Sequence, residues 1–337
     1  MTDVMLTVIM SNYNQEKYIK KAIDSVLMQK VNFAYKLIIT DDCSSKDNSI
    51  QIIEQYSQQY PDIIFPIFNK CNGGYLTNIL RAKSITKTPY FCLLDADDYY
   101  TDENFLQRAF DFLENNKEYV IYYENVNYLY EDGTEKPFIS MDKKNESFEI
   151  QDYFNDNIPI VQTTGQFYRN VIFINGIPKI MSDAIGTESE RSFEGDYDRF
   201  IMHLKYGKAY FNNNICGIYR VLSSGIWAGL TELDKNILQL QCWYDYNRYF
   251  EDKYKEFFIQ KMYNQIKTIQ NNINNNINNL RNIKISEKDI RIIGNLYNFI
   301  IDNKQLIIEY NINKNNKKQM LYKITNFLKR KNPNLSK

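Results

Sequence analysis

The sequence predicts an α/β fold in which a doubly wound, mostly parallel sheet is flanked by helices and followed by a helical C-terminal extension. Short apolar runs alternate with segments of helical periodicity over residues 1–130, which is the pattern of repeated strand–helix units. Polar clusters follow several of these runs, where strands would end. From about residue 233 the periodicity is helical. We therefore expect a first domain at 1–230 and a helical region with a basic tail at 231–337.

The first strand is expected at Met5–Met10, a nearly unbroken apolar run of the kind that is buried on both faces of a parallel sheet. Apolar residues between Ile19 and Leu27 recur at three- and four-residue intervals, which indicates a helix. A second strand is expected at Tyr35–Thr40, and Ser44 with Asp47 has the form of a capping box before the next helix. Further strands are expected at 65–68, 90–94 and 119–123, and further helices at about 50–56, 76–82 and 103–115.

Four polar clusters lie at the expected strand ends. They are Asn12-Tyr13-Asn14, Asp41-Asp42, Asn72-Gly73-Gly74 and Asp95-Ala96-Asp97-Asp98. The carboxyl ends of parallel strands meet at one edge of a sheet, and ligands of open α/β sheets bind there. The sequence therefore predicts one ligand site built from these clusters.

The composition excludes several classes of protein. The 41 basic and 41 acidic side chains balance, which gives no reason to expect nucleic-acid binding, although residues 251–337 carry 17 basic against 7 acidic residues. No apolar run approaches the roughly 20 residues that span a bilayer. Five scattered cysteines without a Cys-x-x-Cys pair favour a reducing cytosol. The single histidine, His203, excludes His-rich metal centres, and we expect it to be a surface or packed residue.

The aspartates of the 95–98 cluster suit a hard divalent cation, Mn²⁺ or Mg²⁺, bound together with diphosphate oxygens; the alternative is a solvated acidic turn. Asp41 and Asp42 could bind a nucleobase or ribose, or could cap a helix. Tyr13 could stack on a base or simply pack. The chain has no Gly-x-x-x-x-Gly-Lys-Ser/Thr and no Gly-x-Gly-x-x-Gly after a strand, so a bound diphosphate would need a metal to neutralise it.

Three residues further along the chain are candidates for the same site. Asp196 begins another expected helix, where it could accept a proton from a hydroxyl or only complement the helix dipole. Arg220 could pair with diphosphate oxygens, with an ordinary salt bridge as the alternative. Trp227 could form the floor of a sugar pocket or belong to the core.

Taken together, these segments resemble a family 2 glycosyltransferase of the GT-A fold, of the inverting, bacterial surface-glycan type. Residues 7–19 (TVIMSNYNQEKYI) resemble V-I-I-P-T-Y-N-x-E-x-Y-I, residues 41–49 (DDCSSKDNS) resemble D-D-G-S-x-D-x-S/T, residues 72–78 (NGGYLTN) resemble N-x-G-x-x-x-N, and residues 95–102 (DADDYYTD) resemble D-G-D-D-Y-W-T-D. Residues 195–197 (GDY) and 219–227 (YRVLSSGIW) resemble the later G-D-W/Y and Y-R-x-H-x-G-G-x-W elements. The resemblance covers about residues 1–230.

The resemblance implies a role for each matching residue. Asn12, Tyr13, Asp41 or Asp42, and Asp95 would hold the nucleotide; Asp97 with Asp95 or Asp98 would bind Mn²⁺ or Mg²⁺; Asp196 would be the general base; and Asn72, Gly74, Asn78, Arg220 and Trp227 would contact substrate. The donor would be a nucleotide sugar, expected to be UDP-linked, and the acceptor a hydroxyl of a growing surface glycan or lipid-linked oligosaccharide. Leu222 replaces a common His, Gly195 a common Glu, Ser11 a Pro and Cys43 a Gly.

Two alternatives remain at this point: a sugar-phosphate nucleotidyltransferase, and a non-catalytic glycan-binding protein on the same fold. Residues 8–20 contain no glycine, whereas a nucleotidyltransferase needs a Gly-rich loop there. The tail at 314–337 has eight basic residues, no acid and regularly spaced apolar residues. It predicts a contact with the inner face of the cytoplasmic membrane, with a dimerising helix as the alternative. The Asn-rich stretch 271–282 keeps helical spacing of its isoleucines, so we expect a packed helix there.

Overall fold

The computed structural model describes residues 3–193, 195–223, 225, 229–275 and 287–303. These residues fall into two compact units, drawn from 1–185 with 193–228 and from 186–192 with 229–337. Segment 186–192 thus belongs to the second unit, although it lies well before the boundary at residue 230 that the sequence suggests. Trp227 and the basic tail at 314–337 lie outside the described residues.

The first unit is built on a single sheet, which contains ten strands among the described residues. Its main order is β3-β2-β1-β4-β9-β6-β10-β5, with β7 paired to β6 and β8 paired to β10. The strands are β1 (Val4–Asn12), β2 (Ala34–Asp41), β3 (Ile64–Phe68), β4 (Tyr90–Asp95), β5 (Tyr99–Tyr100), β6 (Tyr119–Tyr130), β7 (Glu135–Pro137), β8 (Glu146–Phe148), β9 (Gln166–Arg169) and β10 (Lys208–Val221). Strands β1 to β4 are mutually parallel, and β1 lies between β2 and β4 at the point where the strand order reverses.

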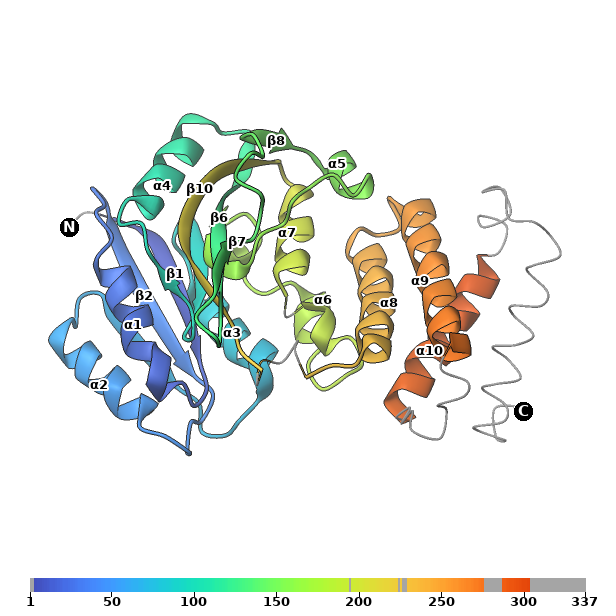
Figure 1. Ribbon diagram of the computed structural model, residues 1–337, viewed down its shortest axis with the longest axis horizontal. Coiled ribbons are helices and arrows are strands. Elements are labelled where there is room, and N and C mark those ends of the chain that lie inside the picture. Colours follow the sequence, from blue (N-terminus) through green and yellow to red (C-terminus); the bar gives the residue numbers. More distant parts are fainter. Residues whose placement is uncertain (1–2, 194, 224, 226–228, 276–286, 304–337) are drawn as a thin grey trace. The chain divides into compact units, whose positions relative to one another are not determined.

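Helices cover both faces of this sheet (Figure 1). The helices of the first unit are α1 (Glu16–Leu27), α2 (Ser49–Gln59), α3 (Gly74–Ile85), α4 (Phe105–Asn115), α5 (Ile150–Phe154), α6 (Lys179–Ser182) and α7 (Asp196–Leu204). Because side chains alternate along a strand, Val8 and Met10 pack with α1, α2 and α4 on one face. Thr40 and Tyr123 point to the other face, where they contact Asn78 of α3 and Phe200 of α7. Every expected strand and helix up to residue 123 is present, and the mixed α/β fold is confirmed.

Residues 131–190, where no strand or helix is expected from the sequence, contribute three strands, β7, β8 and β9. Strand β9 runs antiparallel to both β4 and β6 and joins them. It follows the 3-10 turn Thr163–Gly165, in which a Cβ on Gly165 would lie 2.2 Å from the carbonyl oxygen of Glu124. Only glycine fits so close to a neighbouring backbone, so this turn is held tightly against β6.

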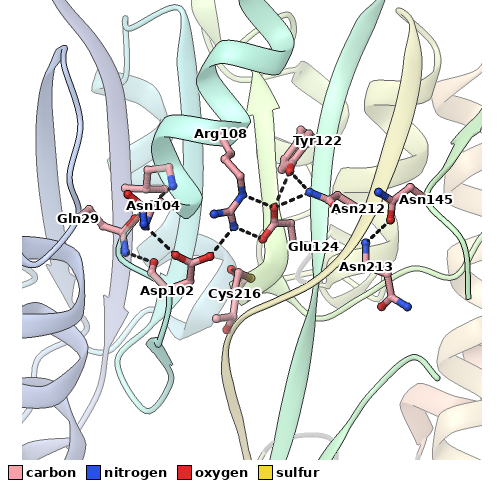
Figure 2. Close-up of polar contacts among 12 residues, drawn as sticks. Gln29, Asp102, Asn104, Arg108, Tyr122, Glu124, Asn145, Asn212, Asn213 and Cys216 are labelled. Atoms are coloured by element: carbon pink, nitrogen blue, oxygen red, sulfur yellow. Dashed lines mark hydrogen bonds and ion pairs between the residues drawn. The ribbon is translucent and has the colours of Figure 1, made fainter. Parts of the chain in front are cut away.

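Strand β10 pairs with β6 in parallel, but its register shifts between Asn212 and Ile215 and again before Gly217. Asparagine side chains hold this bulge. Asn125 Nδ2 donates to Asn213 Oδ1 at 2.8 Å, and the backbone N–H of Asn213 donates to Asn145 Oδ1 at 2.8 Å. Figure 2 shows Asn213 and Asn145 at the bulge. Bulges bend a strand and redirect it, and the redirected half of β10 pairs with β5 through Gly217 and Tyr100.

An ion pair between the half-buried Arg108 and the buried Glu124 lies beside the bulge (Figure 2). Glu124 is fully buried and accepts hydrogen bonds from Arg108 Nη2 at 2.7 Å, Tyr122 at 2.5 Å and Asn212 at 3.1 Å. Arg108 also donates to Asp102 at 2.6 Å. Burial raises the pKa of Glu124, and these donors oppose that rise. The pair therefore connects α4, β6 and β10 in the interior.

The second unit is helical, as expected. It contains α8 (Glu232–Tyr249), α9 (Lys255–Asn275) and α10 (Glu287–Asp302). The fully buried Asp245 of α8 accepts hydrogen bonds from Ser189 Oγ at 2.9 Å, Ser192 Oγ at 2.8 Å and Gln241 at 2.9 Å, so it anchors segment 186–192. Helix α9 includes the first part of the Asn-rich stretch; residues 276–286 lie outside the described residues. Within the part of the chain that the structure describes, no helix is long and apolar enough to cross a membrane.

The first prediction concerns the Arg108–Glu124 pair. We expect Arg108→Met to lower the free energy of unfolding by about 2–3 kcal/mol at pH 8, because Glu124 keeps its burial and loses its counter-charge. The folded-state pKa of Glu124 is already raised and rises further in the variant, so a neutral Glu124 relieves the penalty at low pH. The loss should therefore shrink at pH 5 in urea unfolding. The exposed pair of Lys30 and Glu103 is the control: Lys30→Ala should cost under about 1 kcal/mol at either pH.

Candidate functional site

The predicted polar clusters do meet at the carboxyl edge of the parallel strands. Asn12 pairs in register with Asp41 of the neighbouring strand, and Ser11 pairs with Asp95 on the other side. The clusters therefore lie side by side around the end of β1, where the strand order reverses. Their hydrogen bonds divide them into carboxylates that hold the fold and carboxylates that are available to a ligand.

Asp41 belongs to the first kind. It is fully buried, and its carboxylate accepts from Asn12 Nδ2 at 2.6 Å, Ser44 N at 2.9 Å and Ser44 Oγ at 2.5 Å. Ser44 Oγ in turn accepts from the backbone N–H of Asn14 at 2.8 Å. Asn14 and Cys43 both have positive φ angles, 52° and 63°, so the chain turns sharply on each side of this network. Asn12 and Asp41 thus fix the loop that presents Tyr13, whose side chain is 42% exposed.

Asp42 joins the end of β2 to the start of α3. Its Oδ1 accepts from Asn69 Nδ2 at 3.0 Å and Gly73 N at 2.9 Å, and its Oδ2 accepts from Gly74 N at 2.9 Å. A carboxylate at a helix N-terminus satisfies free N–H groups and complements the helix dipole. Of the two readings left open by the sequence, these contacts favour the cap for Asp42. The backbone N–H of Gly74, an expected substrate contact, is held by this carboxylate.

The predicted contact of Asn78 with substrate is not supported by the structure. Its side chain is buried, donates to Thr40 O at 3.0 Å and Ser11 Oγ at 3.3 Å, and accepts from Thr40 Oγ1 at 2.6 Å and Asn69 Nδ2 at 2.9 Å. All the donors and acceptors of the amide are used, so Asn78 fastens α3 to β1 and β2. Asn72, by contrast, is exposed, and its side chain accepts from Gly74 N at 3.2 Å.

The turn Asp95–Asp98 contains both kinds of carboxylate. Asp98 is buried, and it accepts from Arg220 N and from Thr164 Oγ1, each at 2.8 Å. Because each oxygen has a protein donor, this geometry does not support Asp98 as a metal ligand. Among the residues that the structure describes, the one hydrogen-bond donor to the Asp95 carboxylate is the Tyr75 hydroxyl, at 3.3 Å. Burial and the neighbouring Asp97 raise the pKa of Asp95 to about 7, and burial also raises the pKa of Asp97.

Arg220 supports this turn instead of standing free for a diphosphate. Its guanidinium lies over the rings of Tyr18 and Tyr99, at 4.8 and 4.6 Å from their centroids, and donates to the carbonyl oxygen of Asp97. The two rings and the carbonyl fix the position of the charge, which opposes the raised pKa of Asp97. Arg220 therefore shapes the acidic turn from the redirected half of β10.

Asp196 comes to the same region from the first turn of α7. Its Oδ1 accepts from Thr163 Oγ1 and, at 2.8 Å, from Arg199 Nη2. Burial raises the pKa of Asp196, while Arg199 and Thr163 oppose the rise. Thr163 and Thr164 are consecutive residues, and they bind Asp196 and Asp98 respectively. The 3-10 turn thus holds the expected general base beside the acidic turn.

The residues at the acidic turn fit a divalent cation as an incomplete ligand set. Asp95 and Asp97 are hard oxygen donors; burial raises the pKa of both, and Asp97 adds to the rise at Asp95, so a cation between them would be stabilised. Among the described residues, no group of three His, Cys, Asp or Glu side chains could hold a metal by itself. Two carboxylates would leave coordination positions for the oxygens of a bound diphosphate.

Sequence reasoning missed Tyr75, Thr163, Thr164 and Arg199. The two threonines lie within residues 131–190, where no strand or helix is expected from the sequence. No spacing rule connects them to aspartates more than 30 residues away. Arg199 carries a signal that could have found it, since it follows Asp196 by three residues on one helix face. Of the two expectations for His203, surface or packed, the structure confirms the packed one. The residue is fully buried against Tyr168, and its Nδ1 donates to the carbonyl oxygen of Arg199 at 2.6 Å.

Solved structures with this arrangement of strands include TarS of S. aureus. Residues 1–349 of that protein in complex with UDP-GlcNAc cover 87% of this chain and 81% of their own, with a TM-score of 0.59 and 15% identity. The corresponding complex with UDP gives a TM-score of 0.58 at 16% identity. At such identities the likeness concerns the fold alone, and it confirms the predicted GT-A class.

The sequence profile described as "Glycosyl transferase family 2" matches residues 7–176, half of the chain. The chain therefore belongs to glycosyl transferase family 2, which favours a glycosyltransferase over the nucleotidyltransferase alternative. An uncharacterised glycosyltransferase of Mycoplasma pneumoniae is 35% identical over 108 residues, 32% of this chain and 36% of the relative. An uncharacterised protein of Mycobacterium bovis is 26% identical over 222 residues, 66% of this chain and 60% of its own. The chain thus spans less than two thirds of these relatives.

The second prediction tests the anchoring role of Asp42. We expect Asp42→Asn to lower the free energy of unfolding by about 1–3 kcal/mol, because an amide cannot accept from both Gly74 N and the donors on its other oxygen. Urea unfolding measures the loss. Asp62→Asn, at an exposed position, is the control and should change stability by less than about 0.5 kcal/mol. Equal stability of the two variants would show that Asp42 is not an anchor.

Proposed function

We propose that the protein is an inverting, metal-dependent glycosyltransferase that moves a sugar from a nucleotide donor, UDP-linked, to a hydroxyl of a growing surface glycan or lipid-linked oligosaccharide. The observation that carries the proposal is the 3-10 turn Thr163–Gly165, whose two threonines hold Asp196 and Asp98. This turn brings a carboxylate that can accept a proton next to carboxylates that can bind a cation. Solved complexes of the similar fold with UDP and UDP-GlcNAc support the choice of donor.

In the proposed reaction, Asp95 and Asp97 would hold Mn²⁺ or Mg²⁺, and the bound cation would supply the charge that neutralises the donor diphosphate as a leaving group. Tyr13, exposed on the loop fixed by Asn12 and Asp41, offers a ring on which the base can stack. Asp196 accepts the proton of the acceptor hydroxyl. The acceptor oxygen then bonds to the anomeric carbon as the bond from that carbon to the diphosphate oxygen breaks, and the diphosphate leaves with the electron pair.

The place of the reaction follows from the acceptor. A lipid-linked acceptor would bring the enzyme to the inner face of the cytoplasmic membrane, and we propose that the basic tail at 314–337 makes this contact. Liposome co-sedimentation of the full chain against a chain ending before Lys314 tests this part of the proposal. Equal pelleting of the two proteins with anionic liposomes would remove it.

The third prediction identifies the donor. In a panel of nucleotide sugars, we expect one UDP-sugar to raise the melting temperature of the full chain in the presence of Mn²⁺ or Mg²⁺ and to lose most of this effect with EDTA. The reason is that Asp95 and Asp97 repel a diphosphate unless a cation lies between them. Asp97→Ala should abolish the metal-dependent stabilisation. Stabilisation that is equal with EDTA, or in Asp97→Ala, would contradict the metal role.

The fourth prediction separates the base from the donor site. We expect Asp196→Asn to lower kcat by about 10²–10⁴-fold, the usual contribution of general-base catalysis, since an amide cannot take the hydroxyl proton. Donor stabilisation in the thermal assay should persist, in contrast to Asp97→Ala. The comparison of these two variants is the internal control, because Asp196→Asn keeps the metal-dependent donor stabilisation that Asp97→Ala loses. Full transfer activity in Asp196→Asn would exclude it as the base.

A further inference from the structure

Arg199 holds the proposed base in an unusual way for a buried arginine. Its side chain is 1% exposed, and Nη2 donates to Asp196 Oδ1 at 2.8 Å and to Thr163 Oγ1 at 2.6 Å. The Thr163 hydroxyl donates a hydrogen bond to the same Asp196 Oδ1. Three side chains thus form a closed triangle, and two of its hydrogen bonds end on one oxygen of Asp196.

The triangle makes the two oxygens of Asp196 different. Both side-chain donors reach Oδ1, and within the described residues no side-chain hydrogen bond reaches Oδ2. The Asp196 side chain as a whole is 20% exposed, whereas Arg199 and Thr163 are buried. Of the two oxygens, Oδ2 is therefore the one with a lone pair available to a hydroxyl of the acceptor.

Arg199 is a costly residue to place in the interior. Its Nε and Nη1 are buried and have no hydrogen-bond partner in the part of the chain that the structure describes. Burial of a guanidinium of which only Nη2 is hydrogen-bonded costs hydration, and the charges of Asp196 and Asp198 offset part of that cost. Asp196 is the one acidic group that Arg199 contacts through a hydrogen bond among the described residues. The function of the arginine is therefore to be sought at Asp196.

The charges around the pair set its electrostatics. Besides Arg199, the titratable groups that act on or face Asp196 are Asp95 of β4, Asp198 and Tyr197 of α7, Tyr75 of α3, Tyr128 of β6, Tyr168 of β9 and Tyr219 of β10. Lys83 and His203 face Arg199 and are themselves buried. Neighbours of Asp196 other than Arg199 are thus acids or neutral phenols. Arg199 is the cation that opposes their effect and that of burial on the pKa of Asp196.

We propose that Arg199 is the positioning residue of the general base: with Thr163 it binds Oδ1 of Asp196, turns Oδ2 to the acceptor hydroxyl and keeps the carboxylate ionised. This inference rests on the proposed function, since it takes Asp196 as the base. It adds a residue that acts through Asp196 and touches neither donor nor acceptor.

The fifth prediction concerns the pH dependence of kcat/KM, measured on the full chain with the nucleotide sugar that stabilises it in the donor panel. Removal of the Arg199 guanidinium raises the pKa of Asp196, so a larger fraction of the enzyme holds a protonated, inactive base at a given pH. In Arg199→Met the acid limb should therefore move to higher pH by about one unit or more, with about a 10-fold loss of kcat/KM at pH values below the limb. Arg199→Lys, which keeps the charge, should restore part of both. Thr163→Val should move the limb in the same direction by less.

Two controls separate this role from a structural one. Met202 is a core residue of the same helix, so Met202→Ala should destabilise the protein without moving the acid limb of the pH profile. In the Asp196→Asn background, Arg199→Met should cost no further activity, because its effect passes through the base. An unchanged acid limb in Arg199→Met, or an additional loss in the Asp196→Asn background, overturns the proposal. If Arg199→Met does not fold by circular dichroism, Thr163→Val decides by the same limb. Full activity of Asp196→Asn would instead refute the proposed function.

Discussion

The burial of carboxylates at one edge of the sheet is the constraint on which the rest of the structure depends. Each buried carboxylate needs donors, and at this edge most donors come from backbone N–H groups and short polar side chains. Asp41, Asp42 and Asp98 are supplied in full, by Ser44, the start of α3, Thr164 and β10. Among the described residues, Asp95 has only the Tyr75 hydroxyl as a side-chain donor and Asp97 has none, which is why we propose these two carboxylates as the ligands of a cation.

The later part of the chain is shaped by the same requirement. The bulge in β10 redirects the strand, so that the backbone N–H of Arg220 reaches Asp98 and Gly217 pairs with Tyr100. The turn before β9 fits against β6 only because Gly165 has no side chain, and this places Thr163 and Thr164 between the acidic turn and α7. Irregular elements thus carry the side chains that organise the site, while the regular strands supply the edge on which they meet.

The first 123 residues were predictable because each strand and helix there has its own period and its own polar end. The same patterns located Asp41, Asp42, Asp95 and Asp97 at one edge. What they could not give is which carboxylates already have partners, since the donors to Asp42 come from a turn about 30 residues later. Strand β9 and the two threonines escaped prediction for a related reason: a short strand between two others is fixed by its neighbours and not by its own periodicity.

Segment 186–192 leaves the sheet-based unit, binds the helical unit through Ser189 and Ser192 on Asp245, and returns immediately before α7. The polypeptide therefore passes between the two units three times, near residues 185, 192 and 228, and the middle passage lies only a few residues before Asp196. Removal of α8 would leave Ser189 and Ser192 without their common acceptor, a few residues before α7 and the proposed base Asp196. The helical unit is therefore not a simple C-terminal addition to the chain, because segment 186–192 belongs to it.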